Sequence, residues 1–300
     1  MSKKIVVIGS SNTDMVIKTN VFPLPGETVI GESFMINQGG KGANQAVAAA
    51  RMGGDVTFIS KIGSDFLGAK SIELYRKENI NTDYISVDKQ LLSGVAFITI
   101  DGKGENSIIV DPGANASLVY QDIDKALDAI VNADLILMQC EIPFETVEYV
   151  VDIAYKKNIK VILNPAPVQI IPDELLRKIY LIVPNEIEAE VLSGVKIFDW
   201  DTAKVAAAAL GLRGANNVII TLGSMGALVK QADSYIEIPA IKVKAVDTTA
   251  AGDTFCGSLT FALSNGLTMA EAVKFANKCS SISVTRMGAQ DSIPYKTEIS

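Results

Sequence analysis

Leu135-Ile136-Leu137-Met138-Gln139 is a continuous apolar run of strand length, and Val161-Ile162-Leu163-Asn164 is a second one. Between them, apolar residues recur with helical spacing over residues 146–157. Continuous apolar runs are typical of strands covered on both faces, and a strand–helix–strand unit joins two parallel strands of one sheet. This stretch therefore predicts an α/β fold with a parallel sheet.

The same alternation of apolar runs and helical patterns extends through most of the chain. Further buried strands are expected at residues 5–9, 56–62, 181–184 and 218–222, and another strand at residues 242–246. Helices are expected at residues 43–52, 67–79, 186–193, 202–212, 252–264 and 269–285. We therefore predict a doubly wound, mostly parallel sheet with helices on both faces.

Two stretches interrupt this pattern. Residues 12–36 show strand-like alternation around the turn Pro23-Leu24-Pro25-Gly26, and residues 94–110 hold two β-rich runs joined by a hairpin signal. Either they form a small β-sheet lid of their own or they extend an edge of the main sheet. No repeat or linker-like segment divides the chain, so we expect one domain over residues 1–300, with β-lid insertions at about 12–38 and 92–112.

The composition argues against several classes of function. Of the 300 residues 48% are hydrophobic, which is enough for a sizeable core. The 27 basic and 34 acidic residues give a net charge of −7, so binding to nucleic acid or to a membrane is not expected. No apolar run approaches the ~20 residues needed to cross a bilayer. The apolar part of the N-terminus is too short for a signal peptide.

The cysteines and the absence of histidine restrict the chemistry. Cys140, Cys256 and Cys279 are odd in number and scattered among apolar neighbours, which predicts buried free thiols in a reducing compartment, the cytoplasm. The chain has no histidine, so a His base, a Ser-His-Asp triad and a His-ligated metal are excluded. A general base must be Asp or Glu or, with less support, Lys, Tyr or Cys.

The strongest local signal is Val246-Asp247-Thr248-Thr249-Ala250-Ala251-Gly252-Asp253-Thr254-Phe255, which follows an expected strand and opens an expected helix. Small residues at Ala250, Ala251 and Gly252 let backbone N–H groups approach an anion, and the positive end of the helix dipole favours it too. Asp253 stands in the first helical turn beside that anion site. An anion cradle with a carboxylate at its rim suits phosphoryl transfer to a hydroxyl, with Asp253 as the base.

A second signal is the glycine-rich stretch Gln38-Gly39-Gly40-Lys41-Gly42-Ala43-Asn44-Gln45-Ala46. It matches neither a Walker A loop nor the G-x-G-x-x-G fingerprint, because the spacing and the third glycine are missing. It is a glycine turn that delivers Lys41 and Asn44, donors suited to hydroxyl groups, to the start of a helix. Taken alone, a loop that merely turns the chain explains this stretch equally well.

Together these stretches resemble the two signatures of the ribokinase-like carbohydrate kinase family, here Gly39-Gly40-Lys41-Gly42-Ala43-Asn44-Gln45 and Asp247-Thr248-Thr249-Ala250-Ala251-Gly252-Asp253. The resemblance runs over about residues 5–299, in order and at family spacing. Other family-like strings are Gly9-Ser10-Ser11-Asn12-Thr13-Asp14, Met138-Gln139-Cys140-Glu141, Asn164-Pro165-Ala166-Pro167, Pro184-Asn185-Glu186-Ile187-Glu188-Ala189-Glu190, Thr221-Leu222-Gly223-Ser224-Met225-Gly226 and Thr285-Arg286-Met287-Gly288-Ala289-Gln290.

The resemblance implies an ATP-dependent kinase that phosphorylates the primary hydroxyl of a pentose, with the 5-hydroxyl of D-ribose as the expected acceptor. It implies that Asp253 deprotonates this hydroxyl, and that backbone N–H groups form an anion hole at Ala250, Ala251, Gly252 and Asp253. The positions implied for binding the sugar are Asn12, Asp14, Gly40, Lys41, Asn44, Glu141 and Asp253.

The resemblance also implies sites for the nucleotide and for two kinds of cation. The positions implied for ATP are Asn185, Thr221, Gly223, Ser224, Gly226 and Gly252, with Asn277 near the adenine. Glu188 is expected to organise Mg²⁺ through water. An activating K⁺ is expected at Asp247, Thr249, Ser283, Arg286, Gly288 and Ser292, several of them through backbone carbonyls. Relatives commonly pair their lids, so a homodimer through the β-lid is expected.

Several alternatives remain. Within the family, the substrate could be another sugar or a nucleoside, although no aromatic or apolar room for a base is evident near these motifs. A Rossmann dehydrogenase is disfavoured, because the G-x-G-x-x-G fingerprint is missing. A non-catalytic sugar sensor on the same fold would be expected to have lost Asp253 or the anion-hole string, and both are present.

Overall fold

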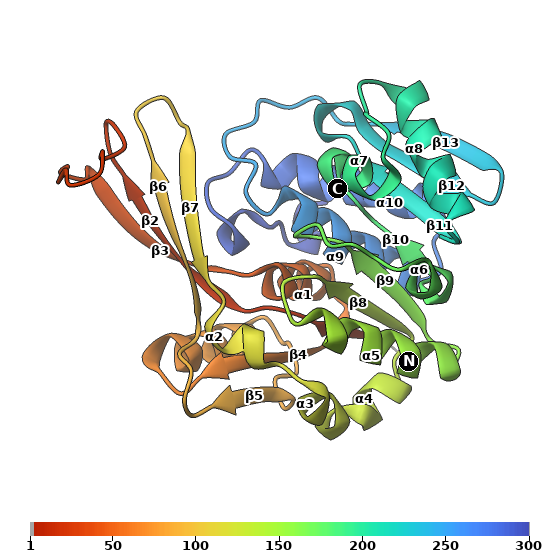
Figure 1. Cartoon of the computed structure of the whole chain (residues 1–300), viewed down its shortest axis with the longest axis horizontal. Helices are drawn as coiled ribbons and strands as arrows, with labels where there is room; N and C mark the ends of the chain where they lie inside the picture. Colours follow the sequence, from red (N-terminus) through yellow and green to blue (C-terminus); the bar gives the residue numbers. More distant parts are fainter. Residues whose placement is uncertain (1–2, 300) are drawn as a thin grey trace.

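The computed structural model describes residues 3–299, which build two β-sheets flanked by helices (Figure 1). The larger sheet has nine strands in the order β13-β12-β11-β10-β9-β8-β1-β4-β5. Its strands are β1 (Lys4–Ile8), β4 (Asp55–Gly63), β5 (Ile85–Asp88), β8 (Leu135–Gln139), β9 (Lys160–Asn164), β10 (Leu181–Ile182), β11 (Asn217–Thr221), β12 (Gly226–Gln231) and β13 (Ser234–Pro239). All neighbours are parallel except the β11–β12 and β12–β13 pairs at one edge.

Ten helices accompany the strands within the described residues. They are α1 (Lys41–Arg51), α2 (Phe66–Lys77), α3 (Tyr120–Lys125), α4 (Leu127–Val131), α5 (Phe144–Lys156), α6 (Asp173–Lys178), α7 (Glu186–Ser193), α8 (Trp200–Leu212), α9 (Ala251–Ser264) and α10 (Met269–Ser283). Short 3-10 turns lie at Gly113–Ser117, Gly223–Met225, Gln290–Ser292 and Lys296–Glu298. None of these helices combines the length and apolar character that a bilayer crossing requires.

The main sheet separates two hydrophobic cores because successive side chains of a strand point to opposite faces. In β1, Ile5 and Val7 join the core formed with α1, α9 and α10, whereas Val6 and Ile8 join the core formed with α3 to α8. All five residues of β8 are buried. The predicted fold class, a doubly wound α/β sheet with helices on both faces, is confirmed.

The smaller sheet has four strands in the order β3-β2-β6-β7 and projects from one side of the main sheet (Figure 1). Its strands are β2 (Asn12–Lys18), β3 (Ser33–Gly39), β6 (Gly94–Ile100) and β7 (Asn106–Asp111). The two stretches that interrupt the α/β pattern therefore pair with each other, rather than extending an edge of the main sheet. Asn12 and Asp14 lie at the N-terminal end of β2, opposite Gly39 and Asn37 of β3.

One predicted strand is wrong. Residues 242–246 form no strand in the described structure, and Ile241, Val243 and Val246 are 47%, 44% and 57% exposed. Within the described part of the chain these residues pair with no strand of the main sheet, although the outer edge of β13 is free. The strand expected at residues 181–184 is also shorter, because β10 has only two residues.

Candidate active site

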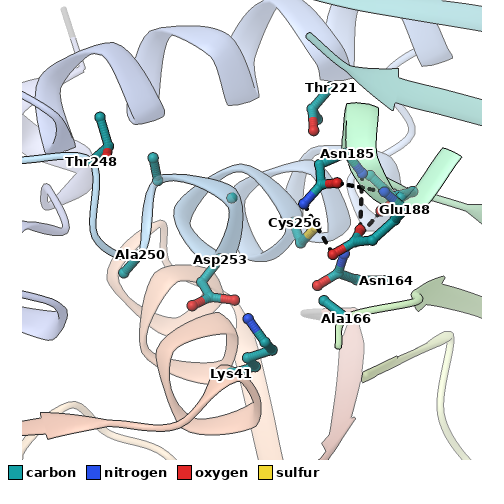
Figure 2. Close-up of a pocket in the computed structure, with 13 residues that line it drawn as sticks. Lys41, Asn164, Ala166, Asn185, Glu188, Thr221, Thr248, Ala250, Asp253 and Cys256 are labelled. Carbon is teal, nitrogen blue, oxygen red and sulfur yellow. Dashed lines mark hydrogen bonds between the residues drawn. The ribbon is translucent and has the colours of Figure 1, made fainter. Parts of the chain in front are cut away.

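The candidate site lies where the carboxyl ends of the parallel strands meet the N-terminal ends of α1 and α9, the usual ligand position in open α/β sheets. A cavity of about 220 Å³ opens there. It is lined by Lys41, Asn164, Ala166, Val183, Asn185, Glu188, Thr221, Thr248, Ala250, Ala251, Gly252, Asp253 and Cys256. Figure 2 shows the Lys41 amine and the Asp253 carboxylate directed toward one another on one side of this cavity, with Asn164, Asn185 and Glu188 on the other side.

Asp253 is held by two side-chain amides from α1. Its Oδ2 accepts a hydrogen bond from Asn44 Nδ2 at 2.9 Å, and its Oδ1 accepts one from Gln45 Nε2 at 2.9 Å. Asp253 is 9% exposed and lines the cavity. A carboxylate that is fixed by amides at the edge of a cavity is well placed to take a proton from a bound hydroxyl.

The N-terminal end of α9 beside Asp253 is suited to an anion. Its N-cap, Ala250, has φ +57°, and no side chain caps the helix. The N–H of Ala251 donates to the Thr248 carbonyl at 3.2 Å, so one N–H of the predicted anion hole already has an acceptor. Gly252 and Asp253 belong to the first turn, whose N–H groups have no intrahelical acceptor. A Cβ on Gly252 would have no atom within 4 Å, so this part of the helix end is open to a ligand.

Lys41 is the cation of the site and begins α1. Burial lowers its pKa, but the carboxylates of Asp253, Glu141 and Glu188 more than offset this, and the pKa is raised overall. The N-cap Gly40 has φ +88°, and a Cβ there would lie 2.6 Å from the Asn12 backbone nitrogen. Glycine at this position therefore allows the loop that carries Lys41 to pass close to β2.

Acidic groups gather around Lys41. Burial, Glu141 and Asp253 raise the pKa of Asp14 to about 6, although Lys41 opposes them. Asp14 packs closely against the glycine loop. A Cβ on Gly39 would lie only 2.3 Å from Asp14 Oδ1, so glycine is required there. Glu141 Oε2 accepts hydrogen bonds from the Ser10 hydroxyl and from the Lys41 backbone N–H, the latter at 3.0 Å.

The positions predicted to bind the sugar are thus brought together from β2, the glycine loop, α1 and the end of β8. Asn12 is 4% exposed, and its Oδ1 accepts a hydrogen bond from Asn115 Nδ2 at 2.7 Å. Asn44 Oδ1 is buried without a hydrogen-bond partner among the described residues. A buried acceptor of this kind suits a ligand that donates to it.

The positions predicted for ATP divide into two groups. Asn185, Thr221 and Gly252 line the cavity. Gly223 and Ser224 lie in the turn before β12, and Gly226 begins that strand; none of the three lines the cavity. Asn277, on α10, lies outside the lining as well, and its Nδ2 donates to the Ile238 carbonyl at 3.4 Å.

Glu188, predicted to organise Mg²⁺, lines the cavity at the start of α7. The Asn185 backbone N–H donates to its Oε2 at 2.9 Å, and Asn185 Nδ2 donates to its Oε1 at 3.0 Å. Its pKa is raised, mainly by burial. A carboxylate fixed by two donors retains lone pairs for water, which fits a cation bound through water. Residues 3–299 hold no cluster of three or more His, Cys, Asp or Glu that could bind a metal ion directly.

The positions predicted for K⁺ come together from three segments beside the α9 N-terminal end. Asp247 Oδ1 accepts from the Thr249 N–H and hydroxyl, and its Oδ2 accepts from the Gly288 N–H at 2.9 Å. Although burial acts to raise it, these bonds hold the pKa of Asp247 below its usual range. The hydroxyls of Ser283 and Ser292 lie 2.9 Å apart. The Arg286 guanidinium pairs with Glu298, so only its backbone could face an ion.

The structure adds polar residues to which sequence reasoning assigned no role. Gln45 and Gln139 are fully buried, and with Asn164 they form a hydrogen-bonded chain that ends on Asp253. Thr248 and Cys256 also line the cavity. Gln139 and Asn164 could have been recognised from the sequence as candidate site residues, because each is a polar residue that ends an otherwise apolar strand.

Comparisons with known proteins agree over the whole chain. Residues 2–296 match the model of the pfkB family carbohydrate kinases. The chain is 45% identical over 298 residues to the ribokinase of Haemophilus influenzae, covering 99% of this chain and 97% of the relative. It is 38% identical to the deoxyribokinase of Salmonella typhi, covering 97% and 95%.

A solved structure of Arabidopsis thaliana ribokinase complexed with ribose and ATP superposes with a TM-score of 0.95 at 30% identity, covering 100% of this chain and 98% of that one. The matches extend over both sheets and over both signature segments. The chain belongs to the pfkB family of carbohydrate kinases.

Proposed function

We propose that this protein transfers the γ-phosphate of ATP to the 5-hydroxyl of D-ribose, giving D-ribose 5-phosphate and ADP. The observation that carries the proposal is the position of Asp253, which lies at the start of a helix whose N-terminus no side chain caps and is directed toward Lys41 in the same cavity. The likeness of the chain to a ribokinase complexed with ribose and ATP supports the two substrates.

The proposed reaction is a direct displacement at the γ-phosphorus of ATP. Asp253 accepts the proton of the sugar hydroxyl, and that oxygen forms a bond to the γ-phosphorus of ATP. The bond between the γ-phosphorus and the bridging oxygen breaks, and ADP leaves. Because charge spreads over the transferring phosphoryl oxygens, N–H groups at the α9 N-terminal end and the Lys41 ammonium would stabilise them.

The sugar would lie between the small sheet and α1, held by Asn12, Asp14, Gly40, Lys41, Asn44 and Glu141, with the small sheet serving as its lid. ATP would lie toward Asn185 and Thr221, near Gly223, Ser224 and Gly226, with Asn277 beside the adenine. Bound Mg²⁺ would neutralise phosphate charge, and Glu188 is the residue that would hold it through water. We regard residues 1–300 as one kinase domain with two lid insertions.

A sugar panel tests the proposed substrate. We expect D-ribose to be the best acceptor and 2-deoxyribose to lose at least ~10-fold in kcat/KM, since a site built from hydrogen bonds rejects a substrate that leaves one of them unmade. Fructose and adenosine should be much poorer. The measurement is ADP release in a coupled assay with each acceptor.

The similarity to a deoxyribokinase makes this comparison informative. A higher kcat/KM for 2-deoxyribose, a hexose or adenosine would overturn the ribose assignment and leave the kinase assignment intact. A protein that binds ribose but produces no ADP with any acceptor would instead be a sugar sensor. Glu141→Ala should reduce the ratio of kcat/KM for ribose to kcat/KM for the other acceptors. It should not abolish the slow hydrolysis of ATP in the absence of sugar.

The proposed monovalent-cation site gives a second prediction. If a cation bound at Asp247 sets the backbone beside α9, K⁺ should activate the enzyme and Na⁺ should do so poorly, because ion size decides how the ligands arrange. In Asp247→Asn the K⁺ concentration for half-activation should rise. Initial rates at constant ionic strength measure both effects, and equal rates in K⁺, Na⁺ and a bulky organic cation would contradict the site.

The small sheet supports a homodimer. Its strand register places Ile17, Phe34, Ile36, Phe97 and Ile109 on the face opposite Asp14, and these side chains are 40–72% exposed. A continuous exposed apolar face of this kind usually marks a contact with a partner. A second copy is the proposed partner, with the two lids packed around a two-fold axis.

We expect a dimeric mass by light scattering at micromolar concentration, and we expect Phe97→Asp to shift the protein toward the monomer. Lys103→Asp, at the turn between β6 and β7, changes charge away from the apolar face and serves as the control. A fully active wild-type monomer would rule out this assembly. The three cysteines are free and buried, which supports the proposed cytoplasmic location.

A further inference from the structure

A chain of side-chain amides, of which Gln45 and Gln139 are fully buried, reaches the proposed base. Gln45 is fully buried, and its Nε2 donates both to Asp253 Oδ1 at 2.9 Å and to Asn164 Oδ1 at 3.0 Å. Its Oε1 accepts from Gln139 Nε2 at 2.7 Å. Both ends of the Gln45 amide therefore have partners, which fixes the orientation of its NH₂ group toward Asp253.

A bound substrate would affect the two amides that hold Asp253, those of Asn44 and Gln45, in different ways. Asn44 donates to Oδ2 and belongs to the set proposed to bind sugar hydroxyls, so its hydrogen bonds would be rearranged when a sugar enters. Gln45 donates to Oδ1 and has no exposed surface, so a ligand cannot reach it. A bound sugar would therefore leave the hydrogen bond between Gln45 and Asp253 in place.

The Gln45 amide also joins the base to the main sheet. Gln139 ends β8 and Asn164 ends β9, and Asn164 Nδ2 donates to the Val183 carbonyl at 2.9 Å. Asp253 is carried by α9, so without Gln45 its carboxylate would depend on the helix and on Asn44 for its position. Misplacement of a catalytic group by about 1 Å can cost ~100-fold in rate.

We propose that Gln45 is the positioning residue for the base: it anchors Asp253 Oδ1, leaves Oδ2 as the atom that accepts the sugar proton, and favours the ionised carboxylate. The inference rests on the proposed function, because it assumes that Asp253 acts as a base. Donation of a hydrogen bond to a carboxylate stabilises its charged form. Gln45 touches no reacting atom and acts only through Asp253.

Other charged or titratable groups also interact electrostatically with Asp253. They are Lys41 of α1, Asp14 of β2, Glu188 of α7 and Cys256 of α9. These groups stay in place in Gln45 variants. A change in pH dependence on altering Gln45 alone would therefore report on its own contact with the base.

The first test is Gln45→Met, which keeps the length of the side chain and removes its donors. We expect kcat to fall at least ~10-fold while the KM for the sugar stays within about threefold, since the loss falls on the chemical step. Asn44→Ala should instead raise the KM of the sugar. A kcat of Gln45→Met within threefold of the wild type would overturn the proposal.

The second test is Gln45→Glu, which exchanges one donor group for an oxygen and so remains informative if the Met variant does not fold. Two adjacent carboxyls share a proton over a range of pH, so the acid limb of the kcat profile should move to higher pH by about one unit. A residue that only fills space would leave the profile unmoved, and an unmoved profile would count against the proposal.

A double-mutant cycle and a matched control separate positioning from stability. In the Asp253→Asn background, Gln45→Met should cause less than a threefold further loss, because the group it positions is gone. Thr146→Val deletes a buried hydroxyl that donates to the Leu118 carbonyl at 2.7 Å, away from the cavity lining, and should lower Tm without changing kcat.

These measurements use the acceptor that the wild type phosphorylates best, so the choice of sugar does not decide them. A wild type that phosphorylates no acceptor would overturn the proposed function. An active wild type whose kcat depends on Asp253, with full additivity of the two substitutions, would overturn only the role of Gln45.

Discussion

Asp253→Asn is expected to lower kcat by at least ~100-fold, the usual effect of losing a general base, with little change in ATP affinity. Asn keeps the size of the side chain and its place in the first turn of α9, but it cannot take the proton of the attacking hydroxyl. The positive end of the helix, Lys41 and the rest of the cavity lining stay in place, so nucleotide binding should persist.

Single-turnover and steady-state rates at saturating ATP and sugar measure this effect, and a calorimetric titration of ATP provides the control for binding. Asn44 Nδ2 and Gln45 Nε2 both donate to Asp253 in the wild type. An Asn side chain has a single acceptor oxygen, so the variant can accept only one of these two hydrogen bonds. A variant that retains more than a tenth of wild-type turnover would remove Asp253 from the role of base.

Lys41→Met should lower kcat/KM for ATP by ~100-fold, because the substitution removes the cation proposed to stabilise the transferring phosphoryl group. Lys41 lies among Asp14, Glu141, Glu188 and Asp253, and its raised pKa keeps it charged throughout the assay range. Without it these carboxylates would repel the triphosphate. Initial rates over a range of ATP concentrations give the value.

Lys61→Met is the matched control for this prediction. Lys61 is also a partly buried lysine, and it pairs with Asp122 at 2.9 Å away from the cavity lining. Its replacement should lower stability while leaving kcat/KM within about twofold. If Lys41→Met behaved in the same way as Lys61→Met, Lys41 would have no part in the chemistry.

Much of the fold was predictable because local pattern and burial agree over long segments. The apolar runs at residues 135–139 and 161–164 are covered on both faces in the structure, as their composition requires. The prediction for residues 242–246 was wrong because strand propensity depends on tertiary context, and these exposed residues pair with no described strand although the outer edge of β13 is free.

The candidate site was predictable where residue type and local geometry coincide. Asp253 stands in the first turn of α9, and Glu188 caps α7 together with Asn185, so short segments of sequence fix both side chains. Gln45 had no such signal. Its contacts with Asp253, Asn164 and Gln139 are 94–208 residues away in sequence, and no periodicity encodes distances of that kind.

The sequence by itself determined the layer architecture, the two glycine-containing loops and the residue types that can serve as base, cation and anion-binding backbone, because these follow from local hydrophobic pattern and backbone freedom. Tertiary structure alone decided that the two interrupting stretches pair with each other, that one face of the small sheet is apolar and exposed, and that two buried amides, Asn44 and Gln45, donate to Asp253. Strand pairing and side-chain burial depend on contacts between segments far apart in the chain. Those contacts exist only once helices and sheets have packed.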